Sequence, residues 1–227
     1  MTPTMVEIFY QLVVFLFAIS VHESAHAWTA SRCGDPTARM LGRVTLNPIR
    51  HIDPIGTVVL PLVAAISGMP VLGWAKPTPV DPRNFRNPVM DDILVSVAGP
   101  VSNFIVATGA LLLLGGISLS SPSAHELVMG LRHGFSGGSS DSALAPVAVL
   151  LYELMLINIV LAVFNLIPVP PLDGSHVLRH FLPDPARMVY DRIGIFGLIA
   201  LVYLGGGLLS SLIRPFVRFY LSILVKF

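Results

Sequence analysis

Two histidines and a glutamate lie together in an apolar stretch of the chain, SVHESAHAW at residues 20–28. His22 and His26 are four residues apart, so on a helix both imidazoles leave one face about one turn apart. Imidazoles at this spacing can bind one zinc ion, and Glu23 would lie beside the metal, where a carboxylate can polarise water. The plainer alternative is two packed histidines with Glu23 facing water. Ionisable groups in so apolar a segment favour the metal site.

A hydrolytic zinc ion usually has three protein ligands and one position open to water, so one ligand remains to be found. Asp173 stands out, in NLIPVPPLDGSH after an apolar stretch. Prolines end the helix before it and Gly174 frees the backbone, so an irregular segment can offer this carboxylate. Irregular backbone at membrane depth is tolerated only where protein or a water-filled cavity surrounds it. The other candidate ligands are all histidines: His51, His125, His133, His176 and His180.

The composition of the chain is that of an integral membrane protein. Of the 227 residues, 54% are hydrophobic and 12% are charged, and the mean hydropathy is +0.77. Soluble domains carry about 25% charged residues. A net charge of +1 argues against nucleic acid as a partner. The single cysteine, Cys33, excludes an internal disulfide and a CxxC metal site.

The apolar segments predict an all-α polytopic membrane protein, a bundle of about four to five spans within a single domain of residues 1–227. A spanning helix needs about 20 mostly apolar residues. After the first span we expect a short membrane-associated β or re-entrant region at residues 35–90, where ARMLGRVTL (residues 38–46) is strand-like. A C-terminal tail, residues 214–227, is expected to lie in the membrane interface or to pack back onto the bundle. The expected spans are residues 5–31, 92–119, 143–169 and 193–213.

Three motifs together resemble the site-2 protease family of intramembrane zinc metalloproteases. They are HESAHA, NLIPVPPLDG and AGPVSN, the last at residues 98–103. The chain also contains segments like those of one subgroup, NPIRHIDPIGT and GWAKPTPV. The family often has LDGG where this chain has Ser175 after LDG. No PDZ-like insertion or CBS-type regulatory domain is visible, so the chain looks like a minimal member.

The resemblance implies a zinc-dependent endopeptidase that cuts peptide bonds within or near transmembrane segments of membrane proteins. It implies one Zn²⁺ per chain on His22, His26 and Asp173, with Glu23 as the general base. Asn165, eight residues before Asp173, matches a family asparagine that contacts the substrate backbone. The expected partners are membrane-protein substrates and the lipid bilayer.

The ligands themselves constrain the topology. The two histidines lie near the end of the first span and Asp173 lies past the fourth apolar segment, so both ends must be on one side. Only one of residues 55–73 and 92–119 can then cross fully. Residues 55–73 are shorter and interrupted by Pro61, Gly68 and Pro70, so we expect them to be re-entrant. Basic loops after the first span and before AGPVSN place the active site toward the cytoplasm, in a cytoplasmic membrane.

The sequence allows more than one role for several other residues and two alternative functions for the chain. His51 is a possible accessory residue, either a gate, a substrate contact or a supplementary ligand, or else a solvated loop histidine. His176 and His180 could form a second metal site, although a juxtamembrane helix is the simpler interpretation. We expect Asn103 to hydrogen-bond across the bundle in support of the site. A metal-ion transporter and a catalytically silent scaffold are the alternative functions, but no inverted repeat is visible and the ligand set and base are all present.

Overall fold

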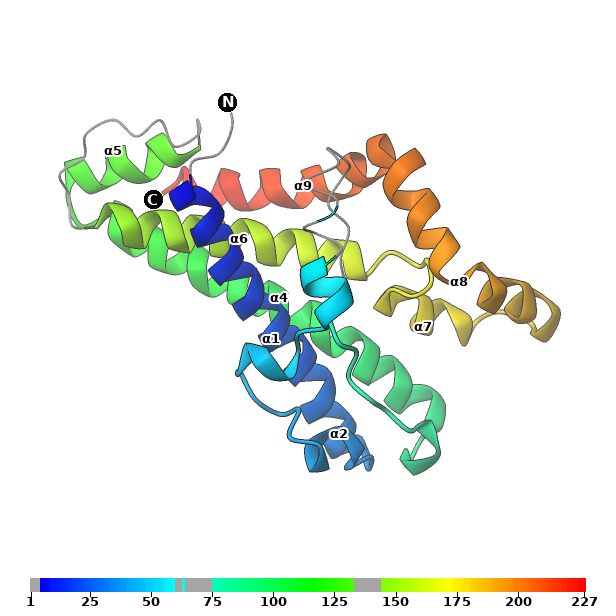
Figure 1. The fold of residues 1–227 in the computed structure, drawn as a ribbon. Helices are drawn as coiled ribbons and strands as arrows, with labels where there is room; N and C mark the ends of the chain where they lie inside the picture. Colours follow the sequence, from blue (N-terminus) through cyan, green and yellow to red (C-terminus); the bar gives the residue numbers. More distant parts are fainter. Residues whose placement is uncertain (1–4, 60–62, 64–74, 133–143) are drawn as a thin grey trace.

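The computed structural model describes residues 5–59, 63, 75–132 and 144–227 as a helical bundle (Figure 1). Long helices are α1 (Met5–Cys33), α4 (Pro88–Ser118), α6 (Ala145–Asn165), α8 (Asp184–Leu204) and α9 (Gly206–Leu224). Shorter ones are α2 (Thr37–Met40), α5 (Pro122–Leu131) and α7 (Asp173–Arg179). Single turns occur at Pro48–Arg50 and Pro82–Asn84, and a π-helical turn at Pro54–Val59. The predicted all-α fold is confirmed.

Within the described part of the chain, four helices are long and apolar enough to cross a membrane: Phe9–Cys33 of α1, and α4, α6 and α9. Proline begins α4 and α5, where its missing N–H leaves no hydrogen bond unmade. The start of α1 and the end of α9 lie near α5 at one end of the bundle, whereas α2, the start of α4 and α7 lie toward the other (Figure 1). Because the start of α1 and the end of α9 lie at the same end of the bundle, the arrangement agrees with an even number of membrane crossings.

Helix α4 is the centre of the bundle and packs against α1, α6, α7 and α9. Its second half contributes Leu111 and Leu114 to a core shared with Met155 and Ile159 of α6 and Leu224 of α9. Its first half faces α1 with small and polar residues instead. The polar site and the apolar core therefore lie at different positions along the same helix. Phe85 and Val95 form a smaller cluster with Ala30 of α1.

The prediction of strand-like structure after the first span is wrong for the described residues, which contain no β-strand. Residues 37–40 are helical because Asp35 accepts hydrogen bonds from the Thr37 N–H (3.1 Å) and hydroxyl (2.5 Å). Gly42 then turns the chain with a φ of +68°. The Thr45 carbonyl accepts bonds from the side chains of Ser24 and His51, not from a strand partner. The predicted re-entrant segment, 55–73, falls mostly outside the described residues.

The C-terminal part of the bundle also differs from the expected boundaries. Gly205 separates α8 from α9, so the expected span at 193–213 is divided between two helices. Gly205 is the first of three successive glycines and lies outside both helices, whereas Gly206 and Gly207 begin α9. Most of the tail, residues 214–224, is part of α9 and packs back onto the bundle, where Tyr220 and Leu224 join the core.

Asp35 joins the end of α1 to the segment that leads into α4. Its buried carboxylate also accepts bonds from the Asp81 N–H (2.8 Å) and the Asn84 amide (2.9 Å). Burial alone would raise the pKa of Asp35, but the hydrogen bonds from Thr37, Asp81 and Asn84 outweigh it and hold the pKa below its ordinary value.

We therefore expect Asp35→Asn to lower the free energy of unfolding by about 2–3 kcal/mol at neutral pH. The donors of Thr37, Asp81 and Asn84 would then face a neutral amide instead of a charged carboxylate. Since the folded-state pKa is lowered, the contribution of the carboxylate is complete above the ordinary aspartate pKa and is lost as the pH falls through the lowered value. Unfolding in detergent across pH measures this. Asp184→Asn, at an exposed carboxylate, is the control; an equal loss in both variants would contradict the prediction.

Candidate metal centre

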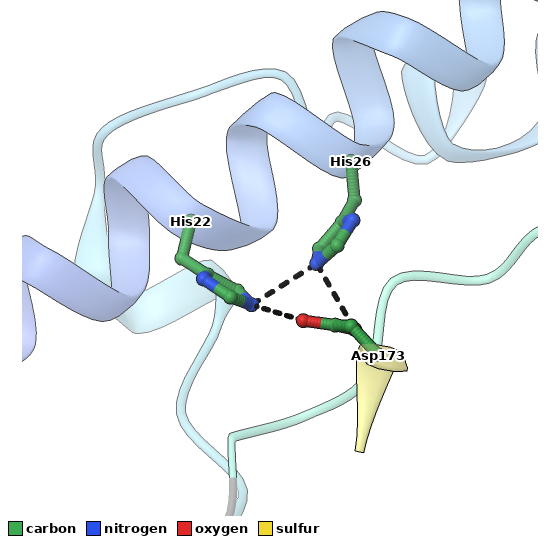
Figure 2. A group of neighbouring side chains, drawn as sticks. All are labelled: His22, His26 and Asp173. Carbon is green, nitrogen blue, oxygen red and sulfur yellow. Dashed lines mark hydrogen bonds and ion pairs between the residues drawn. The ribbon is translucent and has the colours of Figure 1, made fainter. Parts of the chain in front are cut away.

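The side chains of His22, His26 and Asp173 meet between α1 and α7 (Figure 2). The two His Nε2 atoms are 3.0 Å apart. His22 Nε2 lies 3.1 Å from Asp173 Oδ2, and His26 Nε2 lies 3.4 Å from Asp173 Oδ1. Both histidines are 7% exposed. The structure thus gathers three side chains that sequence analysis singled out, from positions up to 151 residues apart in the chain.

Hydrogen bonds fix the orientation of both imidazoles. His26 Nδ1 lies 2.7 Å from the Val95 carbonyl, which can only accept, so Nδ1 carries the proton. His22 Nδ1 lies 2.6 Å from Asn103 Oδ1. The Asn103 amide nitrogen donates to Asn158 Oδ1 (2.7 Å), which assigns the orientation of the Asn103 amide and makes His22 Nδ1 a donor too. In the neutral imidazoles both Nε2 atoms are therefore lone-pair acceptors.

In their neutral forms the two imidazoles therefore direct lone pairs at each other and at the Asp173 carboxylate. A bound cation stabilises such a set of acceptors. Atoms that bind one tetrahedral zinc ion at about 2.0–2.1 Å lie about 3.3 Å apart, close to the three separations observed. Two nitrogens and one carboxylate are also the donor set of hydrolytic zinc sites with an open position. The residues present fit a zinc ion.

Gly99 of α4 allows this cluster to form. A Cβ at residue 99 would lie 2.4 Å from His26 Nε2 and 2.6 Å from His22 Nε2. Gly174 plays the same part for Asp173, because a Cβ there would lie 2.2 Å from the Leu166 carbonyl oxygen. The AGPVSN motif therefore supports the site, and the expected cross-bundle hydrogen bond of Asn103 is present.

The carboxylate of Glu23 leaves α1 beside the cluster and binds a segment far away in sequence. Its Oε2 accepts hydrogen bonds from the Thr78 N–H (3.0 Å) and the Thr78 hydroxyl (2.7 Å). The sequence did not predict this contact. GWAKPTPV resembles a family segment, but nothing in it indicates a partner for Glu23. Val95 and Asn158 were missed as well, because a carbonyl carries no residue signature and Asn158 lies inside an apolar helix.

Other predicted residues lie apart from the cluster. His51 is buried, and its Nε2 donates to the Thr45 carbonyl at 2.9 Å. Asn165 ends α6, with its amide donating to the Leu161 carbonyl at 2.9 Å. His180 pairs with Asp92 at 2.6 Å and His176 is exposed. Among the described residues, His22, His26 and Asp173 form the one group placed to hold a metal ion, so a second site at His176 and His180 is not formed there.

Comparison with known families gives the same family that the sequence motifs indicate. The model of peptidase family M50, the site-2 protease family, matches residues 10–204. The chain belongs to peptidase family M50. This M50 protein is an integral membrane protein with four apolar helices, and an intramembrane zinc protease is its function class; a transporter or silent scaffold is not favoured. Zinc is the cofactor that the family implies, and the cluster of His22, His26 and Asp173 agrees with it.

The names of similar curated proteins agree with this family. The chain is 36% identical over 196 residues to "Putative zinc metalloprotease YwhC" of Bacillus subtilis, covering 86% of this chain and 79% of that protein. It is 30% identical to "Putative zinc metalloprotease Rip2" of Mycobacterium tuberculosis and 28% identical to that of Mycolicibacterium smegmatis. Each of these matches covers 76% of this chain and 58% of the relative. No solved structure matches significantly.

The contact at Gly99 gives a direct test of the metal centre. We expect Gly99→Ala to lower zinc affinity on the order of a hundredfold, because the added methyl group displaces the imidazoles. Zinc per chain, measured by mass spectrometry after dialysis against a chelator, reports the change. Gly109→Ala in the same helix is the matched control, since a Cβ there meets nothing within 4 Å. Wild-type zinc retention in Gly99→Ala would contradict the assigned geometry.

Proposed function

We propose that His22, His26 and Asp173 hold one zinc ion and that Glu23 is the general base for hydrolysis of peptide bonds in membrane-protein substrates. The supporting observation is the convergence of the two His Nε2 atoms with the Asp173 carboxylate, while both Nδ1 atoms face acceptors and Glu23 directly follows His22 in α1. Bound zinc would supply a Lewis acid that activates water and polarises the scissile carbonyl.

The protein's own groups supply the proton transfers and the orientation. Glu23 accepts the proton of the attacking water as the oxygen adds to the carbonyl carbon. When the carbon–nitrogen bond breaks, Glu23 returns that proton to the leaving amine, which balances the reaction. Asn103 and Val95 hold the imidazoles in place through their Nδ1 protons. In this proposal Asn165, at the end of α6, contacts the substrate backbone near the scissile bond.

Substrate helices have to expose a peptide bond, because a helix hides its carbonyl groups in its own hydrogen bonds. His22 and His26 lie in the second half of α1, and Asp173 lies where α7 begins, so the site lies within the membrane-spanning part of α1 and not beyond its end. We therefore infer that cleavage occurs within or near a transmembrane segment that has unwound locally.

Two substitutions separate metal binding from catalysis. We expect Glu23→Gln to keep about one zinc ion per chain and to slow cleavage about a thousandfold, because the base is lost but the ligands remain. Asp173→Ala should lose both zinc and activity. The measurements are zinc content and cleavage of a panel of tagged single-span helices in proteoliposomes. Full zinc retention in Asp173→Ala, or cleavage by Glu23→Gln at the wild-type rate, would overturn the assignment.

We further propose that the site faces the cytoplasm from the cytoplasmic membrane. Connections at the site end, residues 34–87 and 166–205, are rich in basic residues, whereas Arg132 is the basic residue of the connection 119–144. The basic residues at the site end are Arg39, Arg43, Arg50, Lys76, Arg83, Arg86, Arg179, Arg187 and Arg192.

Cysteine labelling tests this orientation. In a Cys33→Ala background, a membrane-impermeant maleimide should label Ser123→Cys in right-side-out vesicles, because residue 123 lies in the opposite connection. Arg83→Cys, whose native side chain is 89% exposed, should react only after the vesicles are opened. The reverse pattern would place the active site outside.

A further inference from the structure

The contact between Thr78 and Glu23 joins residues 55 positions apart in the chain. Both donors of Thr78, its N–H and its hydroxyl, lie within hydrogen-bonding distance of the same atom, Oε2. The hydroxyl is also 3.1 Å from the Glu23 main-chain carbonyl. Among the described residues no donor is recorded for the other carboxylate oxygen, Oε1. One oxygen is thus held and the other is left to accept a proton.

The local sequence explains why Thr78 can hold this position. Thr78 lies between Pro77 and Pro79, and a residue before proline is restricted to extended backbone, which applies to Lys76 and Thr78 alike. Proline has no N–H, so Thr78 supplies the one amide donor of the PTP stretch. The backbone therefore presents the amide and the hydroxyl of Thr78 to Glu23 together.

Both ends of this segment are tied to the rest of the protein. The Lys76 N–H donates to the His51 carbonyl at 2.8 Å. The Asp81 N–H donates to Asp35 at 2.8 Å. Since His51 and Asp35 are both buried, the segment that carries Thr78 is fixed on each side of it. This arrangement gives buried His51 a part in supporting the segment.

We propose that Thr78 is a positioning residue: it holds Glu23 by Oε2 so that Oε1 is directed at the attacking water. This inference rests on the proposed role of Glu23 as the base. A glutamate on a helix surface has several rotamers, and proton transfer needs the acceptor within about 2.6–3.2 Å of the water. Two hydrogen bonds to one oxygen select a single rotamer before substrate arrives, which raises the fraction of bound substrate in reactive geometry.

The test is Thr78→Val, which keeps the shape and the N–H but removes the hydroxyl donor. With a tagged single-span helix that the wild type cleaves, we expect kcat to fall on the order of tenfold with KM unchanged, since substrate contacts remain. Thr78→Ser, which keeps the hydroxyl, should restore kcat. Zinc content should stay at the wild-type level in both variants. Thr108→Val is the matched control, because its hydroxyl bonds Tyr220 (2.9 Å) away from the site.

Every other outcome counts against the proposed role of Thr78 or against the proposed function. A wild-type kcat in Thr78→Val would overturn the proposal, and so would loss of zinc or a rise in KM alone, which would show a structural or a substrate-binding role. Glu23→Gln in the same assay separates the two hypotheses. If it cleaves at the wild-type rate, the proposed function fails; if it is inactive while Thr78→Val is normal, only the role of Thr78 fails.

Discussion

The close approach of α1 to α4 at Gly99 is the contact on which the site depends. Because residue 99 has no side chain, His22 and His26 turn inward and lie against the backbone of α4. Burial then requires a partner for every polar atom of the two rings, since an unpaired buried polar group is costly. The Val95 carbonyl and the Asn103 amide accept the Nδ1 protons, which leaves both Nε2 atoms facing Asp173.

Helix α4 serves two purposes along its length. Its first half provides the glycine, the carbonyl and the asparagine of the polar site, and Asn158 of α6 supports Asn103 from behind. Its second half has Leu111 and Leu114 in the apolar core with α6 and α9. The hydrocarbon of a membrane gives no hydrogen bonds to a polar site, so that site needs a rigid apolar scaffold and partners within the protein. Helix α4 contributes to the scaffold and supplies the partners of both imidazole Nδ1 atoms.

Glu23, the proposed general base, has a different kind of support from the three candidate ligands. The three candidate ligands lie on helices, whereas the carboxylate of Glu23 is held by Thr78 in an irregular connection that returns to the site. That connection is fastened by Asp35 beside the end of α1 and by the His51 carbonyl. Changes in the connection can therefore move the Glu23 carboxylate without touching the three candidate ligands, because the contact with Thr78 is separate from theirs.

The sequence by itself determined the membrane class, the helical fold and the common face of His22 and His26, because composition and a 3.6-residue period are local properties. It also singled out Asp173, which the structure places beside both histidines. It misjudged residues 38–46, where Asp35 and Gly42 favour a short helix and a turn over a strand, and the span that Gly205 interrupts. Only the tertiary structure decided the partners of these groups. Thr78, Val95 and Asn158 reach the site through hydrogen bonds between elements 55 or more residues apart, and their geometry depends on how the helices pack.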